Sequence, residues 1–474
     1  MQNTSSPLLW DIQTAHKALK QKIISSKELT SIFLKQAKSV QKDYNAYITI
    51  CEDHAMSAAK KADEMISKGN INILCGIPYA AKDNICTKGI LTTCASKALE
   101  NFIPPQNAFV IDLLDDCGAV LLGKTNMDEF AMGSDGQSSV FGAAKNPVNA
   151  LYCAGGSSSG SACAVASHSA MFALGSDTGG SVRQPAAFCG VCGMSPTYGA
   201  ISRNGLVSFC SSMDRIGVIT KNAYDNAVVL NELCKHDPND PTCISSNTQN
   251  FTDGITHNAC KLKIGVAPEL FDGDIQPQVK KACLDAINKL GCMGFEIIEI
   301  SFPSFEICSA AYTAISYCEA FSNLSRYDGI RYGSAQESFD NIDKLYTQYR
   351  SRSFGNQVKK RIMLGALCLN TSYYQKALQA KRIIKQDIFK CFEKCDVIVC
   401  PTSPATAHKL NSSNDSVFSD MLTVCASLAD ICAVSINCSH DSNNLPIGLQ
   451  FMAKPFCESQ LYKLAHAYEV QNDK

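Results

Sequence analysis

The sequence predicts an α/β fold in which a β-sheet is covered by α-helices on both faces. Amphipathic segments with helical spacing alternate with short apolar runs along the chain. This repeated alternation is typical of a sheet buried between helical layers. No internal repeat or low-complexity run interrupts it, so we expect a single domain over residues 1–474.

The helical segments carry recognisable start and stop signals. Ser25–Glu28 matches a capping box, and apolar residues at helical spacing follow it. A second amphipathic segment covers about residues 55–68 and ends at Gly69, which is suited to a C-cap. Phe109–Asp116 comes next, and Pro277–Leu290 has its proline where a first helical turn accepts one.

Strands are predicted where short apolar runs stand between these segments. Such runs are too short for helices of ordinary length and fit buried strands. They are Ala119–Leu122, Ile264–Ala267, Phe295–Ile300 and Val397–Cys400, and a further short strand begins at Phe172.

Composition and charge exclude several classes of protein. With 46% hydrophobic and 18% charged residues the chain resembles an ordinary globular protein. Its net charge of −1 argues against a large basic surface, so any nucleic-acid contact should be local or made by a partner. No apolar run reaches the ~20 residues of a membrane span, and residues 1–20 do not resemble a secretion signal. We expect the bacterial cytoplasm, or the mitochondrion if the host is eukaryotic.

The 25 cysteines admit three interpretations: disulfides, metal ligands or buried thiols. Disulfide scaffolds are usually short secreted chains, and from the sequence we expect neither secretion nor a small core here. One CxxC occurs, Cys189–Cys192, but no second ligand pair stands at zinc-finger spacing. Reduced, buried thiols that act as small hydrophobic side chains are the favoured interpretation, with zinc or a redox pair as the alternative.

The most unusual composition lies between Ala154 and Thr197. A Gly/Ser-rich loop, Gly155–Ser161, leads into a run of small residues that is typical of a closely packed helix. Further on, the strand that begins at Phe172 ends in a glycine pair followed by Ser181. Backbone N–H groups of Thr178, Gly179 and Gly180 could point at one spot there, as a tetrahedral oxyanion requires.

Other interpretations of this segment remain open from the pattern alone. The loop has neither the GxxxxGK[ST] phosphate motif nor the GxGxxG fingerprint, and a flexible surface loop fits it as well as a site does. The GxSxG nucleophile elbow is also absent. If Ser181 is a nucleophile, another group must take its proton. Lys82, in an apolar segment, could do so only if burial keeps it neutral; an ordinary surface lysine is the alternative.

The motifs together resemble a known family. Gly155–Ala162, Asp177–Arg183 and the segment around Lys82 are similar to the amidase signature family, whose fold contains a large mixed β-sheet. Within it the chain resembles the A subunits of glutamyl-tRNA(Gln) amidotransferases. The similarity covers essentially the whole chain and includes Gly123–Ser134, Ala186–Gly190, Arg326–Gly333 and Leu445–Gln450.

The resemblance implies a Ser-Ser-Lys triad. Ser181 is then the nucleophile that forms an acyl ester, Ser157 is the bridging serine after a cis peptide bond at Gly156, and Lys82 is the terminal base. One departure from the family pattern lies beside the triad: Ser159 stands where the family has a glycine, which could narrow the backbone freedom next to Ser157.

The resemblance also implies residues that bind the charged groups of a free amino acid. Arg361 corresponds to the arginine that binds the α-carboxylate, Asp420 to the aspartate that binds the α-ammonium, and Tyr312 to a pocket tyrosine. Together they indicate glutamine as the substrate. The triad alone implies no metal and no cofactor in this chain.

The implied activity is that of a glutaminase subunit that supplies ammonia for converting Glu-tRNA(Gln) to Gln-tRNA(Gln). The implied partners are a B subunit, which binds tRNA, ATP and Mg²⁺, and a small C subunit, in a heterotrimer. Asp-tRNA(Asn) is a possible second substrate. Two alternatives stay open: a stand-alone amidase of the same family acting on a small amide, and an assembly subunit without catalysis.

Overall fold

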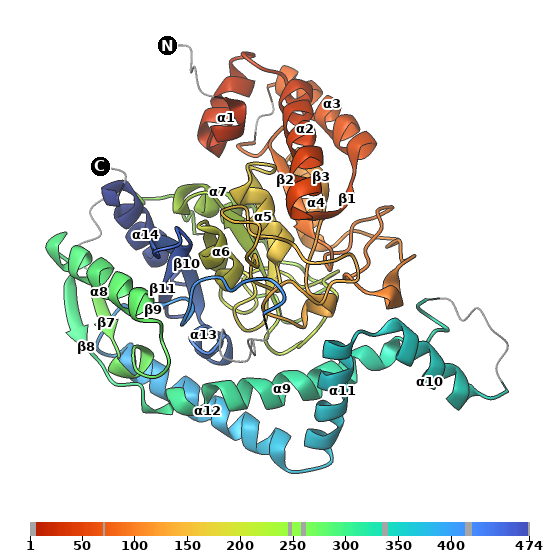
Figure 1. Ribbon diagram of the computed structural model, residues 1–474. Helices are drawn as coiled ribbons and strands as arrows, with labels where there is room; N and C mark the ends of the chain where they lie inside the picture. The colour runs from red at the N-terminus through yellow and green to blue at the C-terminus, as the bar shows by residue number, and fades with distance from the viewer. Residues whose placement is uncertain are drawn as a thin grey trace.

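A computed structural model describes residues 6–69, 72–244, 249–256, 262–333, 340–412 and 420–472. These residues fold around an 11-stranded sheet with the strand order β1-β3-β2-β4-β6-β5-β10-β11-β9-β7-β8 (Figure 1). The strands are β1 Tyr47–Ile50, β2 Pro78–Lys82, β3 Val120–Thr125, β4 Phe172–Asp177, β5 Cys192–Ser195, β6 Arg215–Thr220, β7 Lys263–Val266, β8 Glu296–Glu299, β9 Val397–Pro401, β10 Cys432–His440 and β11 Pro446–Ala453.

The sheet is mixed, as the resemblance implied. β2 runs parallel to β3 and β4, and β7 runs parallel to β8 and β9. The neighbours between β4 and β9 in the sheet order pair antiparallel, and so do β1 and β3. Because β2 and β4 are parallel neighbours, their C-terminal ends meet at one edge of the sheet. Lys82 ends β2 and Asp177 ends β4. The Lys82 segment and the motif that contains Ser181 therefore lie at the same edge of the sheet.

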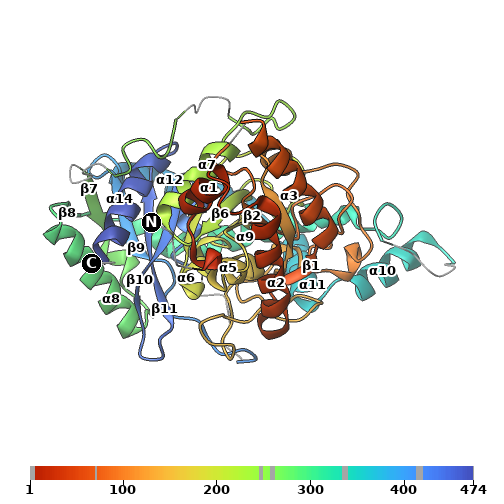
Figure 2. The same ribbon diagram turned by 90° about the horizontal axis from the view of Figure 1, so that it is seen from above.

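Helices cover both faces of the sheet, which confirms the predicted fold class (Figure 2). α5 (Ser159–Ala166) and α6 (Arg183–Cys189) contact each other, and α6 packs on β5, β10 and β11. α7 (Ala223–Leu233) and α14 (Glu458–Asn472) form another contacting pair, with α7 on β5 and β6 and α14 on β10 and β11. The same central strands are therefore sandwiched between two helical layers.

The remaining helices lie at the two ends and along one side. α1 (Ile12–Lys20), α2 (Ser26–Tyr44), α3 (Glu52–Ser67) and α4 (Phe109–Asp116) surround the β1–β3 end, and α8 (Pro277–Cys292) packs on β8 to β11. The other segments are α9 Cys308–Asn323, α10 Ile342–Ser353, α11 Asn356–Leu369, α12 Tyr373–Cys391 and α13 Val424–Leu428, and the 3₁₀ turns η1 Pro7–Leu9, η2 Lys97–Leu99, η3 Glu129–Ala131, η4 Pro268–Leu270, η5 Pro303–Ile307 and η6 Leu324–Arg326.

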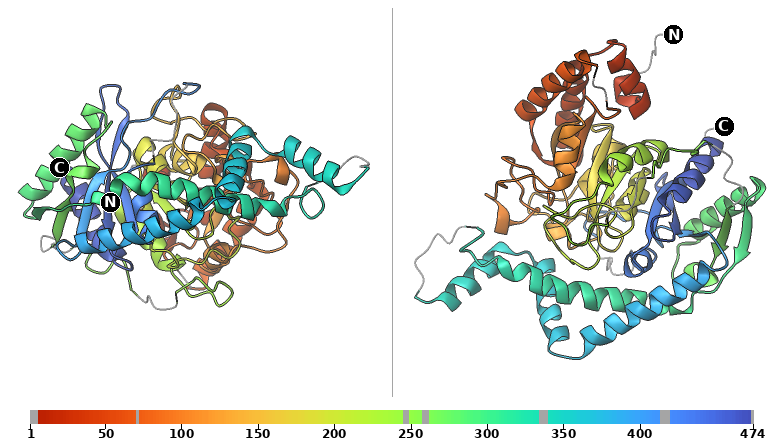
Figure 3. Two further views of the ribbon diagram at one scale, coloured as in Figure 1. Left: turned by 90° about the horizontal axis from the view of Figure 1, so that it is seen from below. Right: turned by 180° about the vertical axis from the view of Figure 1, so that it is seen from behind.

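The layer formed by α9, α11 and α12 has no counterpart among the predicted elements. α9 contacts both α11 and α12, and the three lie on one side of the molecule while α10 extends beyond its end (Figure 3). This layer supplies Tyr312 and Arg361, which lie on α9 and α11. Tyr312 packs against Gly179, just beyond the end of β4, so this layer reaches the edge of the sheet where β4 ends.

The predicted elements agree with the structure to within a few residues. The capping box at Ser25 is confirmed, since Ser25 Oγ accepts from the Glu28 N–H and Glu28 accepts from the Ser25 N–H. Gly69 follows α3 with a φ of +81°, as its predicted role requires. α4 has the predicted bounds, α8 begins at Pro277, and β3, β7, β8 and β9 lie on the predicted runs. That residues 1–474 form one domain stays a prediction.

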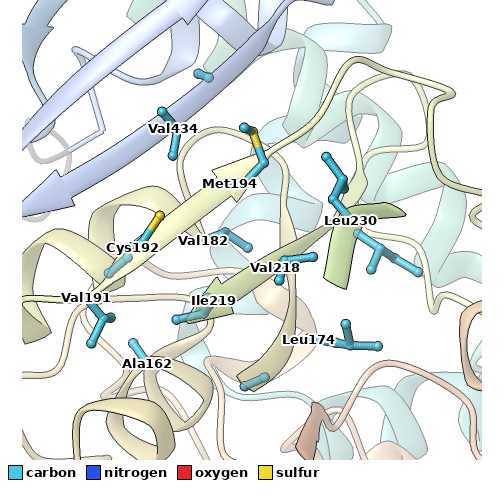
Figure 4. Close-up of a cluster of buried hydrophobic side chains, with 14 of the residues drawn as sticks. Ala162, Leu174, Val182, Val191, Cys192, Met194, Val218, Ile219, Leu230 and Val434 are labelled. Atoms are coloured by element: carbon cyan, nitrogen blue, oxygen red, sulfur yellow. The ribbon is translucent and has the colours of Figure 1, made fainter. Parts of the chain in front are cut away.

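The cysteines are part of the core. Every cysteine in the described ranges is a free thiol, and most are buried. Figure 4 shows Cys192 among apolar side chains that include Met194 and Val218. Burial raises the pKa of the Cys189 and Cys192 thiols above the ordinary value, which opposes the thiolate that zinc binds. The interpretation as buried thiols is confirmed for these residues.

The described part of the chain contains neither a metal-binding cluster nor a membrane-spanning helix. No group of three or more His, Cys, Asp or Glu side chains in these ranges could hold a metal ion. No helix in the same ranges is both long and apolar enough to cross a bilayer.

Candidate active site

Lys82 is buried at the end of β2, where its amine meets the loop that carries Ser157. Its Nζ lies 2.7 Å from Ser157 Oγ, 2.9 Å from Ser176 Oγ and 3.2 Å from the Ser176 carbonyl oxygen. The side chain is fully buried. Burial lowers the pKa of Lys82 to about 7, although nearby carboxylates, Asp128 first among them, oppose this shift. The neutral amine is therefore accessible near physiological pH, as a general base requires.

Ser157 follows a cis peptide bond with Gly156, which confirms the geometry that the resemblance implied. The Gly156 N–H donates to Gln184 Oε1 at 2.9 Å. A Cβ added at Gly156 would lie 2.1 Å from Asp128 Oδ2, so no larger residue fits there without displacing that carboxylate. Close packing on both sides of Gly156 thus places the Ser157 hydroxyl beside Lys82.

Ser181 lies in the turn between β4 and α6, next to the Ser157 loop. Its carbonyl oxygen accepts from the Ser158 N–H at 3.1 Å, so the two serine-bearing loops are hydrogen-bonded to each other. The Ser181 residue is 6% exposed, whereas Ser157 is fully buried. The structure thus brings the three predicted residues to one edge of the sheet, with Ser181 the one that solvent reaches.

A buried ion pair shapes the Ser181 turn. Arg183 donates to both carboxylate oxygens of Asp177, at 2.9 and 3.0 Å, and Asp177 also accepts from the Gly180 and Val182 N–H groups. Burial opposes the charge on Asp177, but the Arg183 guanidinium holds the pKa of that carboxyl below its ordinary value. Asp177 and Arg183 stand at the two ends of the motif that contains Ser181, yet no role was predicted for either.

The expected oxyanion donors are only partly free. The Gly180 N–H donates to Asp177 Oδ1 at 2.8 Å, so it is the one of the three that is already paired in this structure. The Thr178 hydroxyl donates to Asp214 Oδ1 at 2.7 Å. Gly180 has a φ of +139°, and a Cβ there would lie 2.1 Å from Thr423 Oγ1, so both conformation and space demand glycine. The N–H groups of Thr178 and Gly179 remain the candidates.

The three predicted substrate-binding residues line one pocket beside this turn. Tyr312, Arg361 and Asp420 share it with Phe209, Ser316 and Tyr317, among others. The Tyr312 ring lies over Gly179, where an added Cβ would come within 2.5 Å of the ring carbon Cζ. Tyr312 therefore lies between the pocket and the turn that holds Ser181.

The pocket combines a cation with a carboxyl group of adjustable charge. Arg361 Nη1 donates to the Met132 carbonyl oxygen at 2.9 Å, and its guanidinium lies 5.6 Å from the centre of the Tyr317 ring. Burial raises the pKa of Asp420 to about 8, although the Arg361 charge counteracts this. A bound ammonium would favour the ionised form of Asp420, so the pocket fits a zwitterion.

Sequence reasoning missed two polar neighbours of the triad. Ser176 Oγ lies between Lys82 Nζ and Asn84 Nδ2, at 2.9 Å from each. Ser176 is the penultimate residue of β4 and Asn84 comes just after β2, so the parallel pairing of these strands was the signal that could have found them. The departure at Ser159 has a structural explanation: Ser159 begins α5, where no glycine is needed, and its Cβ packs against Gly136.

Comparisons with known proteins match the whole fold. The profile of the family "Amidase" matches residues 28–462. The chain is 46% identical over 469 residues to the A subunit of the glutamyl-tRNA(Gln) amidotransferase from Thermoanaerobacter pseudethanolicus, covering 97% of this chain and 96% of the relative. It is 47% identical to the corresponding protein of Caldanaerobacter subterraneus subsp. tengcongensis, covering 94% and 93%.

Solved structures are similar over the same length. The crystal structure of the A subunit of the Thermotoga maritima glutamyl-tRNA(Gln) amidotransferase superposes with a TM-score of 0.81 at 33% identity, covering 97% of this chain and 94% of that one. Native peptide amidase from Stenotrophomonas maltophilia has a TM-score of 0.85 at 26% identity, with 98% and 97% covered.

Proposed function

The chain belongs to the amidase family, and we propose that it is the glutaminase subunit of a tRNA-dependent amidotransferase. In this role it hydrolyses glutamine through an ester on Ser181, and the released ammonia converts Glu-tRNA(Gln) to Gln-tRNA(Gln) in an ATP-dependent reaction. The observation that carries the proposal is a buried Lys82–Ser157 hydrogen bond, together with a nearby pocket that both Arg361 and Asp420 line. The near full-length similarity to the A subunits of such enzymes supports the same assignment.

The first chemical step is proton transfer away from the nucleophile. Neutral Lys82 takes the hydroxyl proton of Ser157 across their 2.7 Å hydrogen bond, and Ser157 Oγ takes the proton of Ser181 Oγ. Ser181 Oγ then forms a bond to the side-chain amide carbon of glutamine. The carbonyl oxygen becomes an oxyanion, which the N–H groups of Thr178 and Gly179 stabilise.

The intermediate collapses as the C–N bond breaks. Lys82, now an ammonium, returns its proton through Ser157 to the leaving nitrogen, so ammonia departs and a γ-glutamyl ester remains on Ser181. Water attacks this ester with its proton taken by the same relay, which releases glutamate and restores the Ser181 hydroxyl. Acylation and deacylation each end with Lys82 neutral and Ser157 as a hydroxyl, so the proposed chemistry balances without a cofactor in this chain.

Recognition of free glutamine falls to the pocket. Arg361 forms a charge-assisted clamp on the α-carboxylate, Asp420 accepts from the α-ammonium, and Tyr312 packs along the side chain above Gly179. Both charges of the ligand are thereby paired. A simple amide without those charges gains nothing from this pair, which distinguishes a glutaminase from a general amidase.

The proposed enzyme is a heterotrimer. A B subunit binds the misacylated tRNA, ATP and Mg²⁺ and uses the ammonia, while a small C subunit contacts both. A net charge of −1 suits a chain that leaves tRNA binding to its partner. In a bacterium this assembly works in the cytoplasm, and in a eukaryotic host it belongs to the mitochondrion.

Substitution of Arg361 tests the proposed substrate. The assembled wild-type enzyme is expected to release glutamate from glutamine, and Arg361→Ala is expected to raise KM for glutamine by roughly ten- to a hundredfold, because one charge-assisted pair is lost. Turnover of propionamide, which has no carboxylate, should change little. Steady-state assays of both substrates measure this difference.

Arg382→Ala, on the exposed face of α12, is the matched control and should behave as wild type. Wild-type enzyme that hydrolyses propionamide but releases no glutamate would favour a stand-alone amidase. An unchanged KM in Arg361→Ala would contradict the carboxylate clamp.

The pH dependence reports the charge on Lys82. Since its pKa is about 7 and the base must be neutral, activity should rise as the pH increases through 7 and fall about tenfold for each unit well below it. Measurements of kcat/KM for propionamide from about pH 5.5 to about pH 9 isolate this group, because propionamide does not engage Asp420. Activity that is flat, or that declines as the pH rises through the pKa of Lys82, would exclude a lysine base.

A further inference from the structure

Two consecutive acidic residues, Asp128 and Glu129, lie between the triad and the pocket. They form hydrogen bonds with different parts of the structure. Asp128 faces the triad: its N–H donates to the Ser157 carbonyl oxygen at 3.2 Å, and its carboxylate accepts from the Gly136 N–H at 2.9 Å. Glu129 instead reaches α11, which carries Arg361. The short segment from 128 to 132 thus connects the Ser157 loop to the substrate clamp.

Glu129 provides the cap that α11 lacks. Its Oε2 accepts from the N–H of Gly355, the N-cap residue of α11, at 2.8 Å, and its Oε1 accepts from Ser96 Oγ at 2.6 Å. Gly355 offers no side-chain cap of its own. Glu129 is fully buried, and a Cβ at Gly355 would lie 2.4 Å from Oε2. Burial raises the pKa of Glu129 to about 7, and the ionised carboxylate also complements the helix dipole.

The same segment contacts α11 again at Arg361. Phe130 and Ala131 both have positive φ values, 51° and 61°, which turn the chain so that the Met132 carbonyl oxygen accepts from Arg361 Nη1 at 2.9 Å. The Phe130 ring packs on Phe354, just before the N-cap, with centroids 5.7 Å apart. The segment therefore holds α11 at its first turn and at the guanidinium itself.

From these contacts we infer that Glu129 is a positioning residue that aims Arg361 at the substrate carboxylate by holding the N-terminus of α11. The inference rests on the proposed function in naming that carboxylate as the target. Arg361 lies six residues after Gly355, or about 9 Å along the helix at 1.5 Å per residue. Movement of the first turn is transmitted directly to the guanidinium, because a helix moves as a rigid element over this distance.

Substitutions of Glu129 distinguish this role from general stabilisation. In the assembled enzyme, Glu129→Ala should raise KM for glutamine about tenfold or more, with kcat and the turnover of propionamide close to wild type. Glu129→Gln should restore most of the affinity, because its amide oxygen can accept from Gly355 and its NH₂ can donate to Ser96 Oγ. Amide hydrogen exchange over residues 356–361 should be faster in Glu129→Ala and near normal in Glu129→Gln.

Glu458→Ala is the matched control. Glu458 is also fully buried and accepts from the backbone N–H of Thr197 at 2.8 Å, but it begins α14 on the sheet. The Glu458→Ala variant should lose thermal stability, with no change in KM for glutamine or in amide hydrogen exchange over α11. Equal changes in KM in the two alanine variants would overturn the inference. Unchanged hydrogen exchange over α11 in Glu129→Ala would also overturn it, and this measurement does not depend on activity. A wild-type enzyme that releases no glutamate would instead refute the proposed function.

Discussion

Ser181→Ala is expected to abolish glutamate release by the assembled enzyme, with a loss of about 10⁴-fold or more in kcat. Without Oγ no γ-glutamyl ester forms, and water has no activated nucleophile to replace it. The pocket residues Arg361 and Asp420 do not depend on this hydroxyl, so glutamine binding should persist. Glutamate release and calorimetric titration with glutamine measure the two effects separately.

Ser167→Ala is the control for this substitution. Ser167 is 8% exposed, close to the 6% of Ser181, and its hydroxyl donates to carbonyl oxygens of α5 rather than into the site. That variant should keep its activity. Equal glutamate release by wild type and Ser181→Ala would show that another group is the nucleophile.

Lys82→Met should remove activity to a comparable extent while leaving the fold intact or more stable. Methionine fills a similar volume but cannot take the proton of Ser157, so about 10⁴-fold in kcat is expected to be lost. Burying an amine in this site costs free energy through desolvation, and an apolar side chain avoids that cost. Lys82→Arg should also be inactive, because a guanidinium stays protonated.

The matched control is Lys124→Met. Lys124 is equally buried, but it donates to the Ile85 carbonyl and Thr92 Oγ1 and lies 3.7 Å from Asp83. Removing Lys124 leaves the buried Asp83 carboxylate without its cationic partner, so the free energy of unfolding should fall by about 3–5 kcal/mol. Chemical denaturation measures both effects. Lys82→Met should keep or gain stability and Lys124→Met should lose it, which would distinguish a catalytic base from a structural ion pair. Full activity in Lys82→Met would refute the relay.

Much of the framework could be predicted because its signals are local. The Ser25 capping box, the positive φ at Gly69 and the proline at the start of α8 each follow from a few neighbouring residues. The helices α9 to α12 were not predicted. α9 packs against α11 and α12, and α10 contacts η2, so their positions depend on contacts between segments distant in sequence.

The site divides in the same way. The Gly/Ser segments marked Ser157 and Ser181, and the family resemblance related them to Lys82, Arg361 and Asp420. Their meeting depends on pairings between distant segments: β2 beside β4 brings Lys82 to the Ser157 loop, and α9 and α11 bring the pocket to the Ser181 turn. No local pattern contains those pairings.

The sequence by itself determined which groups are present: a lysine in an apolar segment, two serines in glycine-rich turns and residues matching a substrate clamp. Only the tertiary structure decided their chemical state. In the proposed mechanism Lys82 can act as a base because packing removes water from its amine and lowers its pKa to about 7. The proposed role of Arg361 as a clamp likewise depends on Glu129, which caps its helix, and on the Met132 carbonyl oxygen, which accepts from its guanidinium. Desolvation and long-range hydrogen bonds arise from three-dimensional packing, which residue order along one segment does not specify.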